Sequence, residues 1–189
     1  LVVVDTIFSQ NSVDQWGGAV ECSNVSTCVF ANTSFRENRA QLGGAVVINE
    51  ASANLTDCIF LGNAASDFGG ALGVLDAEVS VDHCVLERSN SELGGCIYVQ
   101  DSNVNVNSSE LFENYAETGG SIGLSNSTFV MQNVSVSSGQ ATSDAGAIYI
   151  HVGTLSVRNC TLNSNIADVD GSVVRSFASA ISRSEEHTS

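Results

Sequence analysis

A glycine pair returns at a nearly constant interval along this chain of 189 residues. Its second residue falls at Gly18, Gly44, Gly70, Gly95, Gly120, Gly146 and Gly171, although another residue replaces the first glycine in the last two copies. The spacing is therefore 25 or 26 residues throughout. Seven registered copies indicate a chain built from one repeating unit, and a period of this length is typical of a solenoid.

The residues after each glycine pair alternate between apolar and mixed positions. Two residues after the second glycine stand Val20, Val46, Leu72, Ile97, Ile122, Ile148 and Val173, and two further on stand Cys22, Ile48, Val74, Val99, Leu124, Ile150 and Arg175. This period of two predicts a strand with one buried face. It places Arg175 in an inward column and Tyr98 and Tyr149 together in an outward column. These two tyrosines either form a strip of exposed rings for ligand binding or reflect only the preference of aromatic residues for strands.

Two more apolar columns precede each glycine pair and predict two further short strands. One column holds Phe8, Phe35, Phe60, Leu86, Leu111, Val136 and Leu162, and the other, five positions earlier, holds Val3, Phe30, Leu55, Val81, Val106, Met131 and Val157. Polar columns mark the corners, with Asp5, Asn32, Asp57, His83, Ser108, Asn133 and Asn159 in one and Asn11, Asn38, Asn63, Ser89, Asn114, Gly139 and Asn165 in the other. Asn and Asp tolerate left-handed backbone, and stacked amides form ladders. Each repeat is thus predicted to contain three strands.

Strands this short cannot bury a face alone, whereas stacking identical coils buries a continuous core. We therefore predict an all-β fold, a right-handed single-stranded parallel β-helix of about seven coils of 25–26 residues. The right hand is taken from the chirality bias of parallel crossovers. The β-helix fragment is expected to span residues 1–182 and to be open at both ends.

Two motifs keep register with each other, Phe-x-x-Asn and Gly-Gly-Ala followed by an aliphatic residue. They occur as Phe35-Arg-Glu-Asn38 with Gly43-Gly-Ala-Val46, and as Phe60-Leu-Gly-Asn63 with Gly69-Gly-Ala-Leu72. This pairing resembles the repeats of the chlamydial polymorphic outer membrane protein family. The resemblance implies a pectin-lyase-like right-handed β-helix and an adhesin-like passenger, extracellular or at the cell surface, either secreted or anchored in the outer membrane by a part of the protein outside this fragment.

The last residues, Arg183–Ser189, resemble the translated read-through of a sequencing-library adapter. Segments of this origin are left out of fold reasoning. We therefore expect residues 183–189 to be an artefactual tail.

Charge restricts the partners that this chain can take. It carries 21 acidic and six basic residues, for a net charge of −15. Such a surface repels nucleic acid and anionic membranes, and no apolar run reaches the ~20 residues of a membrane-spanning helix. The expected partners are therefore a host or cell-surface protein or glycan, with no nucleic acid and no membrane insertion by this fragment. No cofactor is expected apart from a weak calcium candidate, a column of carboxylates at Asp67, Glu92, Glu117 and Asp168.

The six cysteines allow two interpretations. Cys58 and Cys84 share an inward column on adjacent coils, with Cα atoms expected ~4.8 Å apart, inside the range for a disulfide. Cys22 and Cys28 flank the loop after a first strand and are a second candidate pair. Alternatively, these side chains are small buried apolar groups.

Asn-x-Ser/Thr sequons are dense in this chain. They begin at Asn24, Asn32, Asn54, Asn107, Asn126, Asn133 and Asn159. In a eukaryotic secretory setting such residues accept glycans on exposed turns. Asn32, Asn133 and Asn159 also belong to a corner column, where a structural role suffices to explain them.

Two functions fit the repeat. The first is a non-catalytic, surface-displayed or secreted β-helix that is structural or adhesin-like. The second is a polysaccharide lyase or glycoside hydrolase of the pectin-lyase-like fold, which requires facing carboxylates or a positioned base. Catalytic residues concentrate on long loops, and the coil length here varies by a single residue, so the sequence favours the first function over an enzyme.

Overall fold

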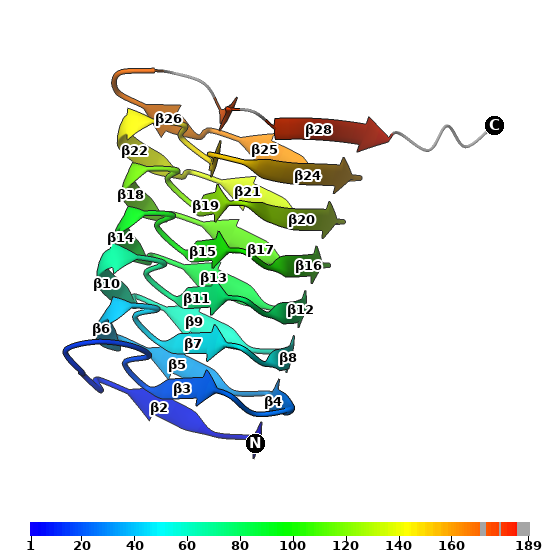
Figure 1. Ribbon diagram of the computed structural model, residues 1–189. Helices are drawn as coiled ribbons and strands as arrows, with labels where there is room; N and C mark the ends of the chain where they lie inside the picture. The colour runs from blue at the N-terminus through cyan, green and yellow to red at the C-terminus, as the bar shows by residue number, and fades with distance from the viewer. Residues whose placement is uncertain (171–172, 178, 185–189) are drawn as a thin grey trace.

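The computed structural model describes residues 1–170, 173–177 and 179–184, and these form a parallel β-helix (Figure 1). Every pair of strands in the described residues is parallel, and none of these residues is helical. Successive coils stack along one axis as a solenoid of about seven turns. The all-β class and the stacked coils confirm the prediction.

Each complete coil contributes to four sheets. Sheet A holds β1 (Val2–Val4), β4 (Thr27–Ala31), β8 (Ser52–Thr56), β12 (Glu78–Asp82), β16 (Asn103–Asn107), β20 (Ser127–Gln132), β24 (Gly153–Arg158) and β28 (Ser179–Ser184). Sheet B holds β2 (Ile7–Ser9), β5 (Ser34–Arg36), β9 (Ile59–Leu61), β13 (Val85–Glu87), β17 (Glu110–Phe112), β21 (Ser135–Ser137) and β25 (Thr161–Asn163). Sheet C holds β6 (Arg39–Leu42), β10 (Ala64–Phe68), β14 (Asn90–Leu93), β18 (Tyr115–Thr118), β22 (Gln140–Asp144) and β26 (Ile166–Ala167). Sheet D holds β3 (Val20–Ser23), β7 (Val46–Asn49), β11 (Leu72–Leu75), β15 (Ile97–Gln100), β19 (Ile122–Ser125), β23 (Ile148–Ile150) and β27 (Val174–Ser176).

The prediction of three strands per coil was wrong, because sheet C supplies a fourth. Its strands turn only one small residue inward, such as Ala65, Ser91 or Ala116, and so show no apolar alternation in the sequence. Sheet C absorbs part of the one-residue variation in coil length, since its register shifts where β10 opposes β6 and β14 and where β22 opposes β18.

The predicted register of the last coil was also wrong. Val174 pairs with Ile148 and Arg175 with Tyr149, one residue later than a spacing of 25 requires. Arg175 therefore falls in the outward column of sheet D, which removes the cost of burying a charge among apolar side chains. The glycine assigned to this copy, Gly171, lies outside the described residues.

One apolar core runs along the inside of all the coils. The predicted inward columns are buried there, and the rings of Phe8, Phe35 and Phe60 stack with centroids 5.3 and 4.7 Å apart. The second glycine of each pair lies where two coils touch, because a Cβ on Gly44 would stand 2.2 Å from the carbonyl oxygen of Gly70. The coils therefore approach so closely at this column that no side chain fits between them.

Two polar corner columns behave differently. The column from Asp5 to Asn159 adopts positive φ in all seven copies, as predicted. In the other column Asn38, Asn63 and Asn114 are buried, and the asparagines form a ladder in which the backbone and side-chain amides of Asn38 both donate to Oδ1 of Asn63 at 3.0 Å. There the left-handed residue is the preceding one, for example Glu37 or Gly62.

The described part of the chain continues to Ser184 at the end of β28. Residues 183 and 184 therefore belong to the segment that was predicted to be an artefactual tail, and residues 185–189 lie outside the described residues. The origin of that tail stays a prediction.

Candidate functional site

The outer surface of sheet D carries a groove between the corner with sheet C and the corner with sheet A. The walls and floor are formed by Trp16, Gln41, Leu42, Asn49, Asp67, Phe68, Leu75, Asp76, Tyr98 and Gln100. These residues come from the first four coils and are brought together because columns of the repeat stack in register: Trp16 bridges to Leu42, and Leu42 pairs with Phe68. The groove is therefore a product of the solenoid and not of an inserted loop.

The groove floor is a second, small apolar cluster outside the main core. Leu42, Val47 and Tyr98 are buried in it, and Leu75 and Leu93 pack against them. The outward column of sheet D has a gap at Gly73, where a Cβ would stand 3.1 Å from Cγ of Leu42, so the leucine side chain occupies the space that a larger residue would fill.

Tyr98 and Tyr149 share the outward column of sheet D as expected, but they do not form an exposed strip of rings. Tyr98 is only 6% exposed, because the ring of Phe68 stacks on it with centroids 4.8 Å apart, and its hydroxyl lies 3.1 Å from Oε1 of Gln100. Burial raises the pKa of Tyr98, so its hydroxyl stays protonated at neutral pH. The accessible rings in the groove are Trp16 and Phe68, exposed by 38% and 36%.

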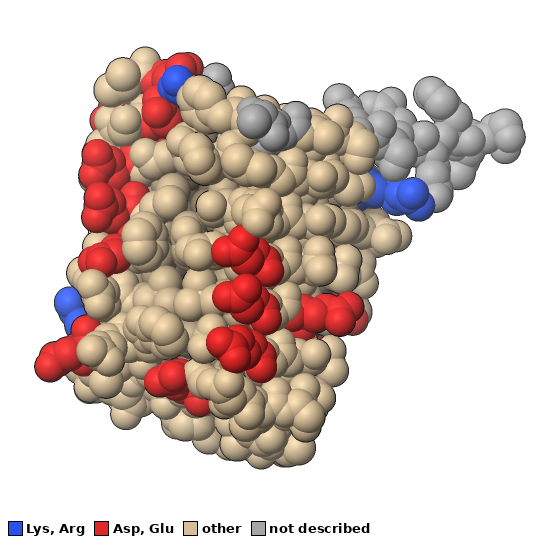
Figure 2. Space-filling model, in the orientation of Figure 1, with Lys and Arg blue, Asp and Glu red and all other residues tan. Residues whose placement is uncertain are grey.

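Carboxylates flank the groove in two columns, which Figure 2 shows as two files of acidic side chains on this face. The first contains Asp67, Glu92 and Glu117 on three successive coils, with Cα atoms expected ~4.8 Å apart. Asp67 accepts hydrogen bonds from Nε2 of Gln41 at 2.8 Å and from Oγ of Ser66 at 2.6 Å. The sequence predicted this first column.

The structure does not bring Asp168 next to the rest of that column. Ala141 pairs with Ala116 on one side and with Ala167 on the other. The coil between those of Glu117 and Asp168 therefore has Thr142 and Ser143 in this column, and no carboxylate. Within the described residues no three His, Cys, Asp or Glu side chains are grouped closely enough to hold a metal ion. Calcium binding at Asp67, Glu92 and Glu117 stays a prediction.

The second acidic column was missed by the sequence analysis. Glu50, Asp76 and Asp101 occupy the left-handed corner between sheets D and A, with φ of 50°, 47° and 51°. Each lies six residues after the second glycine of its repeat, so a fixed offset in the sequence could have revealed them. Hydrogen bonds from Asn126 and Gln100 lower the pKa of the Asp101 carboxyl.

All seven sequons lie on sheet A or on its two edges. Asn54 and Asn107 are in its strands, Asn24 and Asn126 in the corner with sheet D, and Asn32, Asn133 and Asn159 in the corner with sheet B. All are exposed apart from Asn107, which is half-buried. Glycan attachment stays a prediction, but its sites would all lie away from sheet C.

Some of these asparagines also have structural contacts. Nδ2 of Asn32 donates to Asp5 at 2.7 Å, and Nδ2 of Asn126 donates to Asp101 at 2.6 Å, each across one coil spacing. The structural role considered for the corner column therefore applies to Asn32.

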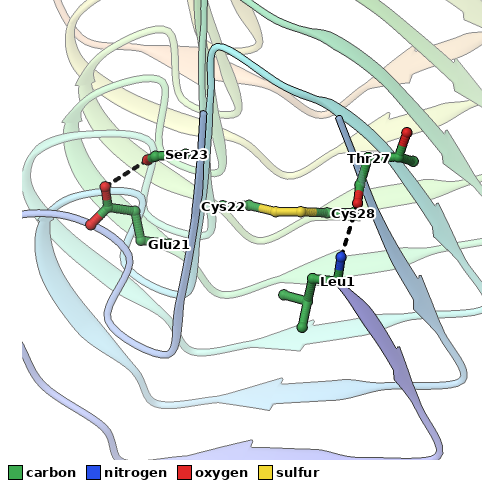
Figure 3. The surroundings of a disulfide bond; sticks show 6 residues. All are labelled: Leu1, Glu21, Cys22, Ser23, Thr27 and Cys28. Atoms are coloured by element: carbon green, nitrogen blue, oxygen red, sulfur yellow. Dashed lines mark hydrogen bonds between the residues drawn. A yellow bond between two sulfur atoms is a disulfide. The ribbon is translucent and has the colours of Figure 1, made fainter. Parts of the chain in front are cut away.

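The structure records a disulfide between Cys22 and Cys28, inside the corner between sheets D and A (Figure 3). Both side chains are buried at positions that the next coil fills with Ile48 and Ala53. The corner that it closes is one residue longer than its counterpart in the second coil.

Cys58 and Cys84 are free thiols in this structure, as are Cys96 and Cys160. Instead of a disulfide, the backbone amide of Cys58 donates to Sγ of Cys84 at 3.4 Å. The hydrogen bond with the Cys58 side chain and burial raise the pKa of Cys84, and burial raises that of Cys96.

Comparisons with known proteins agree with the resemblance seen in the motifs. Residues 5–23 match the family model of the Chlamydia polymorphic membrane protein repeat. This match and the β-solenoid confirm the resemblance to that repeat, over one copy of it. No solved structure matches the chain.

Two curated proteins of Dictyostelium discoideum are also similar to this chain. A metabotropic glutamate receptor-like protein R is 32% identical over 90 residues, which are 46% of this chain and 6% of the relative. A transmembrane domain-containing protein is 32% identical over 83 residues, 42% of this chain and 5% of the relative. The match therefore spans a small fraction of either relative. In the part of the chain that the structure describes, no helix is long and apolar enough to cross a membrane.

Proposed function

We propose that this chain is a section of a surface-displayed or secreted β-helix that serves as an adhesin-like binding scaffold. The observation that carries the proposal is the uninterrupted stack. In sheets A, B and D the coils pair residue for residue from β1, β2 and β3 to the last strand, and the length variation is absorbed as bulges in sheet C and as one extra residue in the corner that Cys22 and Cys28 close. Such a stack presents side chains at fixed spacing along a rod and leaves little room for the long loops from which catalytic clefts are built.

Four further features support display outside the cytosol. Seven sequons gather on one side of the molecule, and a disulfide closes one corner, as is common in oxidising compartments. The two similar Dictyostelium proteins are named as receptor-like and transmembrane domain-containing. The match to a polymorphic membrane protein repeat supports the same location.

The test compares binding with turnover. The purified chain is immobilised and probed with extracellular matrix proteins, host-cell surfaces and a glycan array, and in parallel it is incubated with acidic polysaccharides. We expect saturable binding to at least one surface and no release of unsaturated or reducing-end products. Turnover that is lost in a triple variant Asp67→Asn, Glu92→Gln and Glu117→Gln would overturn the proposal in favour of a polysaccharide lyase or hydrolase.

A further inference from the structure

The sheet D groove combines two kinds of group that attract the same ligand. Trp16 and Phe68 expose aromatic faces, and the carboxylates of Asp67 and Asp76 stand at opposite sides of the same groove. Aromatic faces attract cations through their quadrupole, and a guanidinium also stacks on them and bonds carboxylates. The lining residues include no Lys, Arg or His.

At its C-terminal end, the outer face of sheet D already holds a guanidinium, that of Arg175. Arg175 lies in the same outward column of sheet D as Tyr98 and Tyr149. Its Nη1 bonds the carboxylates of Asp144 and Asp170, and its guanidinium carbon lies 4.8 Å from the centroid of Phe177.

The two ends of the face are related by the repeat. Asp144 belongs to the corner column that holds Trp16, Leu42 and Phe68 in the first coils, since pairing connects these residues from coil to coil. At the C-terminal end of sheet D, the guanidinium of Arg175 thus lies near one aromatic ring and two carboxylates. The groove in the first four coils offers the same kinds of group, aromatic rings and two carboxylates.

We propose that the sheet D groove binds arginine side chains of a basic, extended segment in a partner protein. The net charge of −15 attracts such a segment, and the groove provides the ring and carboxylate contacts that hold a guanidinium. The proposal rests on the scaffold function above and names the chemistry of its partner. The groove opens on sheet D, whereas five of the seven sequons lie on sheet A or at its corner with sheet B.

The experiment uses the one tryptophan of the sequence as a reporter, because Trp16 lines the groove. The whole chain is titrated with capped hexa-arginine and its tryptophan fluorescence is recorded. A hexamer of citrulline, which keeps the shape of arginine without its charge, is the matched peptide control. We expect a saturable change with hexa-arginine, at least tenfold weaker binding of hexa-citrulline, and several-fold weakening of the arginine complex between 0.05 and 0.5 M salt.

The protein variants distinguish binding in the groove from nonspecific attraction to the negative charge of the whole chain. The double variant Asp67→Asn and Asp76→Asn is expected to weaken binding about tenfold, and Phe68→Leu about threefold. Leucine already occupies the Phe68 column at Leu42 and Leu93, so it fits the strand at this position, while the ring that stacks on Tyr98 is removed. The control, Glu78→Gln and Glu110→Gln, removes two charges from exposed positions on sheets A and B and is expected to change affinity less than twofold.

Three results would overturn the groove proposal. These are equal binding of both peptides, equal weakening by the groove and control variants, and a fluorescence response to neutral oligosaccharides in place of arginine peptides. In each case the scaffold function survives if the chain still binds a host surface, so the two proposals fail separately.

Discussion

At the scale of single residues, the repeat depends on positions where adding or removing one side-chain atom disturbs the stacking of the coils. The left-handed corner between sheets A and B accepts Asp, Asn, His and Ser, such as Asp57 and His83, because these residues tolerate positive φ, and this was readable from the sequence. The buried bonds of Asn63 were only partly readable. Its Nδ2 donates to the carbonyl of Phe35 at 2.9 Å, a contact that depends on how the next coil is placed.

Two glycines of the third coil make a matched pair for testing coil contact. A Cβ on Gly70 would stand 2.3 Å from the carbonyl oxygen of Gly95, whereas a Cβ on Gly62 has Cγ of Glu37, at 3.7 Å, as its nearest neighbour. Gly62 has φ of +63°, so Gly62→Ala costs only the left-handed strain, about 1 kcal/mol. Gly70→Ala forces two coils apart and is expected to cost about 3 kcal/mol or more.

The measurement is the free energy of unfolding from urea titrations of both variants and the parent chain. Equal losses for the two variants would contradict the close approach of coils at the glycine column. The comparison stays informative if Gly70→Ala fails to fold, because Gly62→Ala reports the left-handed strain alone.

At the scale of elements, prediction succeeded where a strand turns large apolar residues inward and failed where it turns one small residue inward. Sheets A, B and D were visible as apolar columns, but sheet C turns only Ala65 or its equivalents inward. The groove could not be derived from sequence, because the side chain of Phe68 must cover Tyr98 from another strand, and alternation alone predicts that Tyr98 is exposed.

Cysteine chemistry tests the corner between sheets D and A. Without reductant, iodoacetamide is expected to modify four of the six cysteines in the unfolded chain, because Cys22 and Cys28 are joined. In the folded chain only the half-buried Cys160 is expected to react at pH 8, since Cys58, Cys84 and Cys96 are buried. The hydrogen bond with Cys58 and burial also raise the pKa of Cys84, and burial raises that of Cys96.

Mass spectrometry of the intact chain and its peptides counts the modified residues. Two modified cysteines in the unfolded chain would mean that Cys58 and Cys84 are also joined, and six would mean that no disulfide forms. Closing so short a loop stabilises by about 2 kcal/mol in the chain-entropy model, so reduction should lower the free energy of unfolding by a similar amount.

At the scale of the whole molecule, the stack separates two kinds of surface. Sheet A and its edges carry all seven sequons, and sheet D carries the groove with its two acidic columns. The repeat could be predicted from sequence because each column recurs at a nearly constant spacing. The register of the last coil could not, since its extra residue falls where another residue has replaced the first glycine of the pair. A scaffold of this kind depends on coils that remain in register along the entire rod.

That register can be measured directly in solution. Ser9 and Asn163 are exposed and lie in the same column of sheet B, joined by six successive pairings. Nitroxide labels on cysteines at these two positions, in a chain with Cys160→Ser, allow the distance to be measured by pulsed electron paramagnetic resonance. Six coil spacings of ~4.8 Å predict one narrow distribution corresponding to a Cα separation of about 29 Å. A broad distribution, or a mean beyond roughly 45 Å, would contradict the continuous stack of coils.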